Sequence, residues 1–374
     1  MSNYRLEESN LPIVSFFAIF RIIMIQLAPM DDTKITSRQE KILNFLLSHP
    51  KSTRKEISDE PSRITVIRDI NDLEEKGLVV SEGSGRTTTY SIKPEATLLI
   101  PIDLKSYFER EADERNPRYK KFNPEIFASF GTLFSPEELE LFENGKTRFS
   151  ETLGGLDKTQ IRKELERFAI ELSWKSSQIE GNTYSLLETE ELIKGRQEAA
   201  GHDHSEATMI LNHKKAFDMI LESSEKFKEI SAHDIRTVHS VLVEGMNIEK
   251  NTRERAVGIT GTTYLPPENR WQIEEALEKL QLGLAKIDDA PSKSLLLLAM
   301  LSYIQPFSDG NKRTARMVSN AVLLANGCFP LSYRSVDEVE FKEALVLFYE
   351  QNSLYHLKRV FLEQQRFAIE TYFK

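Results

Sequence analysis

The chain has 374 residues, of which 40% are hydrophobic and 29% are charged. This length exceeds one ordinary compact domain, and the composition allows sizeable hydrophobic cores and excludes disordered and fibrous chains. The single cysteine, Cys328, can form neither an internal disulfide nor a four-thiolate metal site, which favours a cytoplasmic protein stabilised by its core. A formal net charge of −9 argues against wholesale binding to polyanions but leaves room for one local DNA-binding module.

Residues 1–30 form an apolar N-terminal extension. Its stretch 11–27 has nearly the roughly 20 residues that a membrane-spanning helix needs, but Arg21 interrupts it and acidic residues precede it. Three interpretations stay open: a start codon assigned upstream of the true start at Met30, a helix that packs on the protein, and a membrane anchor. Because no later segment needs a membrane, we expect no membrane partner.

Residues 31–95 are expected to form a small α+β unit. Apolar residues recur at helical spacing within 39–47, a second helix begins near Thr53, and a third covers 63–75. Two short extended runs joined by a glycine-rich turn then predict a hairpin over 78–92. This order resembles the winged helix-turn-helix family, in which the third helix enters the DNA major groove.

That resemblance implies DNA contacts from the third helix and from the hairpin, or wing. The candidate residues are Arg63, Thr65, Arg68 and Arg86. Acidic and basic residues are nearly balanced in this unit, which weakens the electrostatic footprint expected of a strong DNA binder. DNA binding therefore stays open beside a second interpretation, dimerisation or contact with another protein.

The rest of the chain is expected to be helical. Residues 96–148 are highly charged at first and favour a helical linker, and 149–374 show helical periodicity with one extended interruption. Residues 295–304 are apolar on all sides, which predicts a buried helix at this length. Pro306 cannot continue that helix, and the turn residues 309–311 can cap a new one.

The start of this new helix is a candidate phosphate site. Free backbone N–H groups beside Gly310 favour an anion, and Arg313 and Arg316, three residues apart, can both bind phosphate oxygens. Asp309 could hold a hydrated Mg²⁺ that bridges phosphates, and Phe307 would anchor the loop. The alternative is a capped surface helix with two solvated arginines.

Residues 305–316 resemble the signature of the Fic family, His-Pro-Phe-x-Asp-Gly-Asn-Gly-Arg-x-x-Arg. The matching positions are Pro306, Phe307, Asp309, Gly310, Asn311, Arg313 and Arg316. The resemblance extends over about 150–350 and implies a mainly α fold that transfers AMP from ATP to a hydroxyl of a target protein, with ATP and Mg²⁺ as cofactors. It implies Asp309 as metal ligand and an ATP-binding set of Phe307, Gly310, Asn311, Lys312, Arg313 and Arg316.

Two positions depart from this signature. Lys312 replaces the second glycine, as in the related Doc branch, which phosphorylates its target. Gln305 stands where the family has the histidine that accepts the proton of the attacking hydroxyl, and a glutamine amide does not titrate near neutral pH. General-base catalysis contributes about 10²–10⁴-fold, so nucleotide binding is expected and transfer is expected to be impaired. Whether AMP or a phosphoryl group is transferred stays open.

An amphipathic helix over about 161–181 ends in Ser176-x-x-x-Glu180-Gly181. Glu180 lies in its last turn, where a carboxylate opposes the helix dipole and favours a nearby cation. The motif resembles the inhibitory helix of Fic proteins, which implies that Glu180 pairs with Arg316 and obstructs the γ-phosphate of ATP. An exposed glutamate before an ordinary glycine cap is the alternative.

The extended interruption, residues 257–267, alternates β-branched residues with glycines and ends in two prolines. It resembles the family's flap, a short β-hairpin whose edge aligns a target segment by strand addition. The flap residues would be Gly258, Ile259, Thr260, Gly261, Thr262 and Thr263. A plain connecting hairpin is the alternative.

Two functions follow for a protein with a winged helix unit at 31–95, a linker at 96–148 and a Fic domain at 149–374. The first is a protein adenylyltransferase inhibited by Glu180 and impaired by Gln305. The second is a transcriptional regulator that senses nucleotide and binds DNA. A homodimer is compatible with both, and the target protein is not defined by the sequence.

Overall fold

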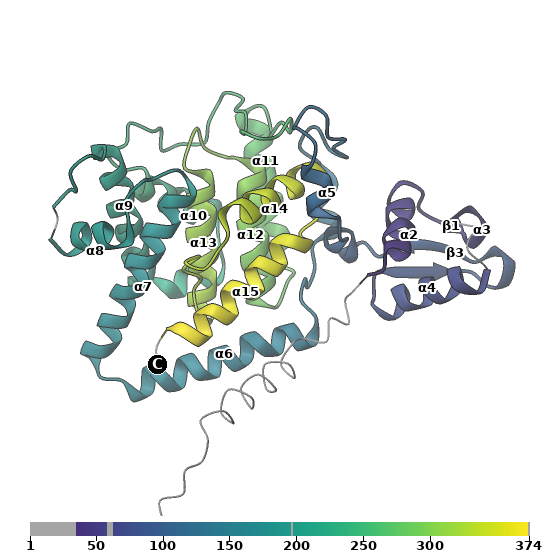
Figure 1. Ribbon diagram of the computed structural model, residues 1–374, viewed down its shortest axis with the longest axis horizontal. Coiled ribbons are helices and arrows are strands. Elements are labelled where there is room, and N and C mark those ends of the chain that lie inside the picture. Colours follow the sequence, from purple (N-terminus) through teal and green to yellow (C-terminus); the bar gives the residue numbers. More distant parts are fainter. Residues whose placement is uncertain (1–34, 58–62, 196, 373–374) are drawn as a thin grey trace, which may run out of the picture.

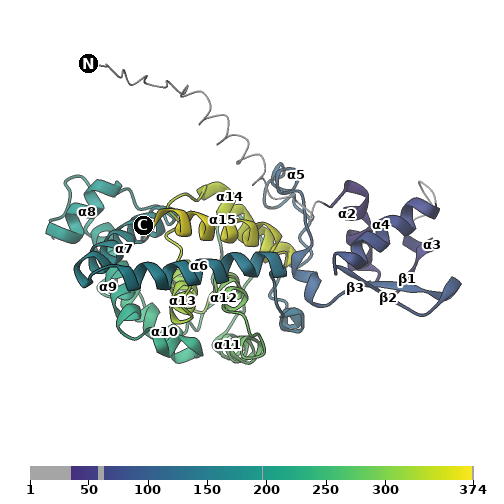
Figure 2. The same cartoon turned by 90° about the horizontal axis from the view of Figure 1, so that it is seen from below.

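The computed structural model describes residues 35–372 except 58–62 and 196. The predicted N-terminal extension, 1–30, lies outside the described residues. A small α+β unit and a larger helical body lie side by side and are joined near α5 (Leu104–Phe108) in both views (Figures 1 and 2). No helix of the described residues is long and apolar enough to cross a membrane.

The small unit combines a three-stranded antiparallel sheet with helices that pack on it. The sheet has the order β1-β3-β2, and β2 pairs with β3 from Val79↔Ile92 to Glu82↔Thr89. The elements are α2 (Ser37–Ser48), β1 (Ser52–Thr53), α3 (Arg54–Ile57), α4 (Arg63–Glu75), β2 (Val79–Glu82) and β3 (Thr89–Ile92).

Local sequence signals explain these elements. The side chains of Thr36 and Gln39 form a capping box that starts α2. Apolar residues of α2 and α4, including the fully buried Leu43 and Ile70, build a separate hydrophobic core. The predicted third helix and hairpin are therefore present, with a short additional strand, β1, at one edge of the sheet.

The expected helical linker over 96–148 is helical only in part, and its last residues, 136–148, belong to the long helix α6. Only short helical segments occur before α6 begins at Pro136, because prolines interrupt the stretch repeatedly. The linker also packs on the body: the backbone N–H of Leu354 donates to Leu98 O at 2.6 Å, and Ser353 Oγ donates to Ile100 O at 2.6 Å. The two cores thus meet at residues 98–100.

The body is an all-helical assembly around α12 and α13. In Figure 1 these two helices lie side by side at the centre, with α7, α9 and α10 on one side and α11, α14 and α15 on the other. The helices are α6 (Pro136–Gly155), α7 (Lys158–Ile179), α8 (Leu186–Gly195), α9 (His204–Glu222), α10 (Ala232–Leu242), α11 (Arg270–Leu284), α12 (Ala290–Ile304), α13 (Asn311–Ala325), α14 (Glu338–Gln351) and α15 (Tyr355–Thr371). Every residue of α12 except Lys293 is buried, which agrees with the buried helix predicted for 295–304.

The β-hairpin predicted over 257–267 does not form. This segment contains a turn and no strand pair of its own. Gly261 takes a φ of +84°, and the N–H of Tyr264 donates to Thr262 Oγ1 at 3.1 Å and not to a strand partner. The one backbone bridge of the segment joins Leu265 to Lys121 of the linker, in parallel orientation. We keep the name flap for residues 257–267.

Candidate functional site

The loop between α12 and α13 begins at Gln305, which caps α12 in a left-handed conformation with φ of +50°. Its amide Nε2 donates to Ser302 O at 2.7 Å, so the side chain folds back onto the end of α12. The buried Arg253 donates from Nε to Gln305 O at 2.7 Å, and its backbone N–H donates to Pro306 O at 3.0 Å. Both contacts satisfy carbonyl groups of the first two loop residues and fix the start of the loop.

Asn311 and Phe307 brace the middle of the loop. Asn311 Nδ2 donates to Phe307 O, and the N–H of Phe307 donates to Asn311 Oδ1, both at 2.8 Å. The ring of Phe307 is fully buried and stacks on His239, with 3.6 Å between centroids. Phe307 therefore anchors the loop in the core, as the sequence predicts, and its ring is too buried for the ATP contact that the resemblance implies. The side chain of Asn311 is engaged with Phe307, which leaves its backbone N–H for an anion.

His239 holds the other side of the loop. Its Nε2 lies 3.0 Å from Asp309 O, and burial lowers the pKa of His239 to about 4. The ring is thus neutral near pH 7, and Nε2–H donates to the carbonyl. The sequence predicts His239 only as a buried histidine in an apolar helix, and its contact with the loop arises from the packing of α10 against α13.

The first turn of α13 has no side-chain cap. Gly310 precedes the helix with φ of +77°, and a Cβ there would lie 3.1 Å from Val243. Glycine is favoured by the backbone conformation and by the limited space, and it has no side chain that could cap the helix. An uncapped helix start attracts phosphate through its N–H groups and its dipole.

Asp309 and Arg313 lie at the mouth of the loop. Arg313 Nη2 is 3.3 Å from Asp309 Oδ2, and the Arg313 side chain is 3% exposed whereas that of Asp309 is 67% exposed. Mg²⁺ in nucleotide sites is commonly bound by one or two carboxylates together with phosphates and waters. The described residues contain no group of three or more metal-ligating side chains. Asp309 thus fits a cation that a nucleotide brings with it and does not form a metal site alone.

Arg316 directs its guanidinium group at α7 and is only 1% exposed. Nε donates to Ser176 Oγ at 2.9 Å, Nη2 to Ser176 O at 2.8 Å and Nη1 to Glu180 Oε1 at 2.8 Å. Burial acts to raise the pKa of Glu180, but the positive charges of Arg316 and Lys312 outweigh it and the pKa is lowered. Glu180 is therefore an ionised partner of a buried arginine, and not an exposed residue before a glycine cap.

His213 of α9 stands behind this contact and was not singled out from the sequence. Its Nε2 lies 2.9 Å from Ser176 Oγ and its Nδ1 lies 2.8 Å from Met209 O. Burial lowers the pKa of His213 to about 3, so the neutral ring donates from Nδ1 and accepts from the serine hydroxyl. Ser176 is thereby oriented to accept from Arg316. In the sequence, the only sign of this role is a histidine directly after Asn212 in an amphipathic helix.

A cavity of about 320 Å³ opens beside the loop. It is lined by Ile179, Glu180 and Gly181 at the end of α7, by Ile259 and Thr260 of the flap, by Lys312, and by Lys342, Leu345, Val346 and Tyr349 of α14. Apolar walls with two lysines at the rim fit a ligand that has a flat apolar part and an anionic part. The contribution of α14 is not predictable from the sequence, because only tertiary packing brings that helix to the loop.

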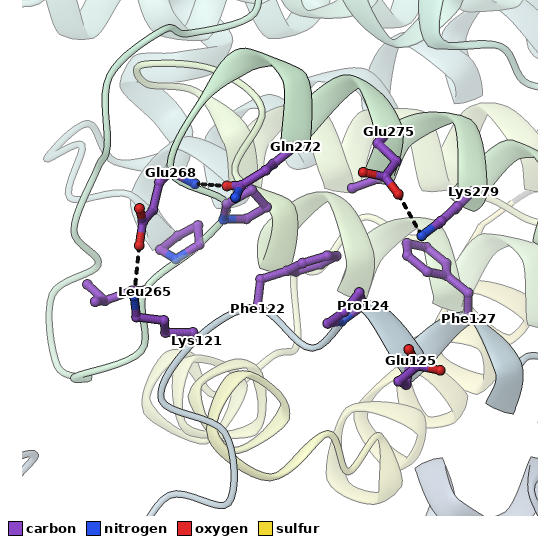
Figure 3. Close-up of a pocket in the computed structure, with 13 residues that line it drawn as sticks. Lys121, Phe122, Pro124, Glu125, Phe127, Leu265, Glu268, Gln272, Glu275 and Lys279 are labelled. Atoms are coloured by element: carbon purple, nitrogen blue, oxygen red, sulfur yellow. Dashed lines mark hydrogen bonds and ion pairs between the residues drawn. The ribbon is translucent and has the colours of Figure 1, made fainter.

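A larger cavity of about 600 Å³ lies elsewhere, between the linker and α11. Figure 3 shows Phe122 and Phe127 of the linker on one side, with the ion pairs Lys121–Glu268 and Glu275–Lys279 at the rim. Residues of the α12–α13 loop are absent from its lining, so its size does not connect it with the phosphate site.

The fold and the loop define a helical protein with a braced loop and an uncapped helix start between α12 and α13. Residues 229–323, which contain this loop and the flap, match the model of the Fic/DOC family. The chain therefore contains a Fic/DOC domain. The matched segment ends before α14 and begins after α7, so Glu180 and the α14 wall of the cavity lie outside it.

Curated relatives are protein adenylyltransferases. The chain is 26% identical to protein adenylyltransferase Fic from Nematostella vectensis over 177 residues, covering 46% of this chain and 41% of the relative. It is 26% identical over 125 residues to a probable protein adenylyltransferase from Aquifex aeolicus, covering 33% and 39%. The chain spans about two fifths of the length of these relatives.

Solved structures share the fold. Fic-1 from C. elegans superposes with a TM-score of 0.52 at 19% identity, covering 63% of this chain and 70% of that chain. A Fic domain containing signaling protein from Bacteroides thetaiotaomicron gives 0.51 at 17% identity, covering 62% and 96%. The mainly helical fold predicted from the sequence is thus confirmed as a Fic fold.

Proposed function

We propose that the chain is a Fic-type nucleotidyltransferase that binds ATP with Mg²⁺ and transfers AMP to a hydroxyl of a target protein. The observation that carries this proposal is the braced loop with its uncapped α13 start, which lies beside the 320 Å³ cavity and inside the Fic/DOC segment. ATP would place its base and ribose in the cavity and its phosphates at the start of α13. A bound Mg²⁺ would neutralise phosphate charge, with Asp309 as its protein ligand.

The transfer requires a proton acceptor. The target oxygen attacks the α-phosphorus, the bond from that phosphorus to pyrophosphate breaks, and the hydroxyl proton leaves to a base. The motif position at which the family has its histidine holds Gln305. Its amide nitrogen donates to Ser302 O and cannot take up a proton near neutral pH. We therefore expect slow transfer, and phosphoryl transfer of the Doc type is the other outcome that Lys312 suggests.

Glu180 would restrain the site further. Its ion pair with Arg316 occupies an arginine that could otherwise hold the terminal phosphate, and its carboxylate lies in the cavity wall. An incoming triphosphate would meet negative charge at this point. The proposed inhibitory role of Ser176, Glu180 and Gly181 follows from this competition for Arg316.

A second proposed function is a cytoplasmic regulator that senses nucleotide and binds DNA through residues 31–95. The exposed face of α4 favours it: Ile64 is 80% exposed and Arg68 is exposed, whereas Val66 and Ile70 on the opposite face are buried. Thr65 is half-buried, and the side chains of Arg63 and Arg86 lie outside the described residues. The missing proton acceptor at Gln305 is compatible with a domain that binds nucleotide without turning it over.

Labelled ATP tests the first function directly. The protein is incubated with Mg²⁺ and either α-labelled or γ-labelled ATP, and calorimetry measures ATP affinity in parallel. Label from the α-position alone indicates AMP transfer, and label from the γ-position alone indicates phosphoryl transfer. Arg313→Ala should weaken ATP binding by about 1.5–3 kcal/mol because it removes a charged hydrogen bond.

The matched control is Arg162→Ala, which removes an exposed arginine from α7, away from the loop. Its affinity should equal that of the parent protein. Equal affinities for the parent and a folded Arg313→Ala variant would overturn the phosphate site.

A further inference from the structure

One buried carboxylate outside the Fic/DOC segment joins the linker to the flap. Glu350 of α14 is 0% exposed and accepts from four side-chain donors. Arg115 donates to it twice, from Nε at 3.0 Å and from Nη2 at 2.9 Å. Tyr107 Oη and Thr262 Oγ1 each donate at 2.6 Å. The linker supplies Arg115 and Tyr107, and the flap supplies Thr262.

Arg115 also reaches the flap directly. Its Nη2 donates to Gly261 O as well as to Glu350, and its guanidinium lies 4.9 Å from the ring centroid of Phe108. The backbone of Glu350 is engaged too, because its carbonyl accepts from the N–H of Tyr119 at 2.9 Å. Arg115 is therefore held in one orientation by groups from the linker, the flap and α14.

A second contact holds the far end of the flap. The N–H of Leu265 donates to Lys120 O at 2.9 Å, and the N–H of Phe122 donates to Leu265 O at 3.0 Å. Figure 3 shows Lys121 and Leu265 side by side at the rim of the larger cavity. The linker thus uses the backbone groups of Leu265 that a target strand would need at this point.

The flap and α14, which these contacts join, both line the candidate nucleotide cavity. Ile259 and Thr260 line the cavity, and the next two residues of the flap are those held by Arg115 and Glu350. Tyr349 also lines the cavity and directly precedes Glu350. Movement of the network would therefore move two walls of the cavity.

We propose that Arg115 and Glu350 are positioning residues, through which the linker holds the flap against the nucleotide cavity. Buried ion pairs add little net stability compared with apolar residues of the same size, and their best-attested use is to specify one arrangement. Here the fork of Arg115 specifies the arrangement of linker, flap and α14. That Arg115 and Glu350 affect nucleotide placement rests on the proposed function. That they hold the flap in position does not depend on it.

The test uses the full chain with Glu180→Gly as the parent, so that the proposed inhibition is absent. The main variant adds Arg115→Met and Glu350→Met together, which leaves no unpaired buried charge. Arg115→Lys keeps the charge but cannot contact both Glu350 oxygens and Gly261 O. Arg110→Met is the control, because Arg110 is an exposed arginine of the same linker. Amide hydrogen exchange is followed over the whole chain, and calorimetry measures the affinity for ATP with Mg²⁺.

In the double variant, exchange in residues 258–265 should rise about tenfold or more, with α6 and α12 unchanged and ATP affinity several-fold lower. Arg115→Lys should recover part of both effects, and Arg110→Met should resemble the parent. Unchanged exchange in 258–265, or a rise spread evenly over the body, would overturn the proposal. A parent that binds no ATP would refute the nucleotide site, while the exchange data would still decide whether the linker positions the flap.

Discussion

Arg316 carries its charge at a position where only 1% of the residue is exposed, so the groups around it decide what the site can bind. Ser176 satisfies two of its nitrogens and neutral His213 fixes the serine hydroxyl, but only Glu180 supplies a negative charge. Removing one partner of a buried ion pair leaves the other charge uncompensated, which costs about 3–5 kcal/mol. A phosphate that replaces Glu180 would restore the balance, so inhibition and nucleotide binding are competing ways to neutralise one arginine.

Glu180→Gly and Gln305→His should act on successive steps of the proposed transfer. Glu180→Gly alone should improve ATP placement and leave transfer slow, because Gln305 still accepts no proton. Gln305→His alone should stay restrained by Glu180. The double variant should incorporate α-label about 10²–10⁴-fold faster than Glu180→Gly, the range expected of general-base catalysis. The measurement is label incorporation by all four proteins, with candidate targets present.

Two results would contradict this scheme. Fast transfer by the unmodified protein would mean that another group accepts the proton. A folded double variant that binds ATP and transfers nothing would favour the nucleotide-sensing function.

A residue's role was predictable where its partners lie close to it in the sequence, and not where they lie far away. The loop residues Asp309 to Arg316 form one continuous motif, and Glu180 carries a local signal as an acid in the last turn before a glycine. His213 and Glu350 act through contacts between segments far apart in the sequence, and a buried polar residue alone does not identify its partner. The sequence predicts Phe307 as the anchor of the loop, but its stacking partner, His239, lies on α10 and is not predictable from the motif.

At the scale of elements, helices with continuous patterns were predicted well and the flap was not. The bounds of α4 agree with the expected 63–75, and the apolar run 295–304 is the buried end of α12. In residues 257–267, alternation of β-branched residues with glycines suggested a hairpin, but a strand requires a partner. The flap instead contacts the linker through Leu265 and Glu350 through Thr262.

The exposed face of α4 allows a direct test of the DNA-binding function. If α4 lies against the phosphate backbone, affinity for duplex DNA should fall steeply as salt rises, and Arg68→Ala should reduce the slope of log K against log salt by about 1. The control is Arg270→Ala at the start of α11, in the body and far from this unit along the chain. Fluorescence anisotropy of labelled duplex DNA, measured at several salt concentrations, gives the affinity of both variants. Absence of binding by the full chain at low salt would leave protein contact as the role of this face.

At the scale of the whole molecule, two hydrophobic cores share one chain. The small unit buries its own cluster around Leu43 and Ile70, and the body buries a much larger one around α12. A domain of about 60 residues buries a smaller fraction of its surface than a larger one and is correspondingly less stable. The linker contacts at Leu98 and Ile100 connect the units by hydrogen bonds to Leu354 and Ser353, just before α15, without merging the cores.

Urea unfolding should therefore proceed in two steps, with the small unit first. Both tryptophans, Trp174 and Trp271, belong to the body, and Trp174 donates from Nε1 to Tyr184 O at 3.1 Å, so its fluorescence follows the body alone. Far-ultraviolet circular dichroism follows both units and should show an additional early transition. ATP with Mg²⁺ at about 100 times its Kd should stabilise the body by about 2.7 kcal/mol and leave the early transition unmoved. A single coincident transition that ATP shifts as a whole would instead mean that the linker makes the two units unfold as one.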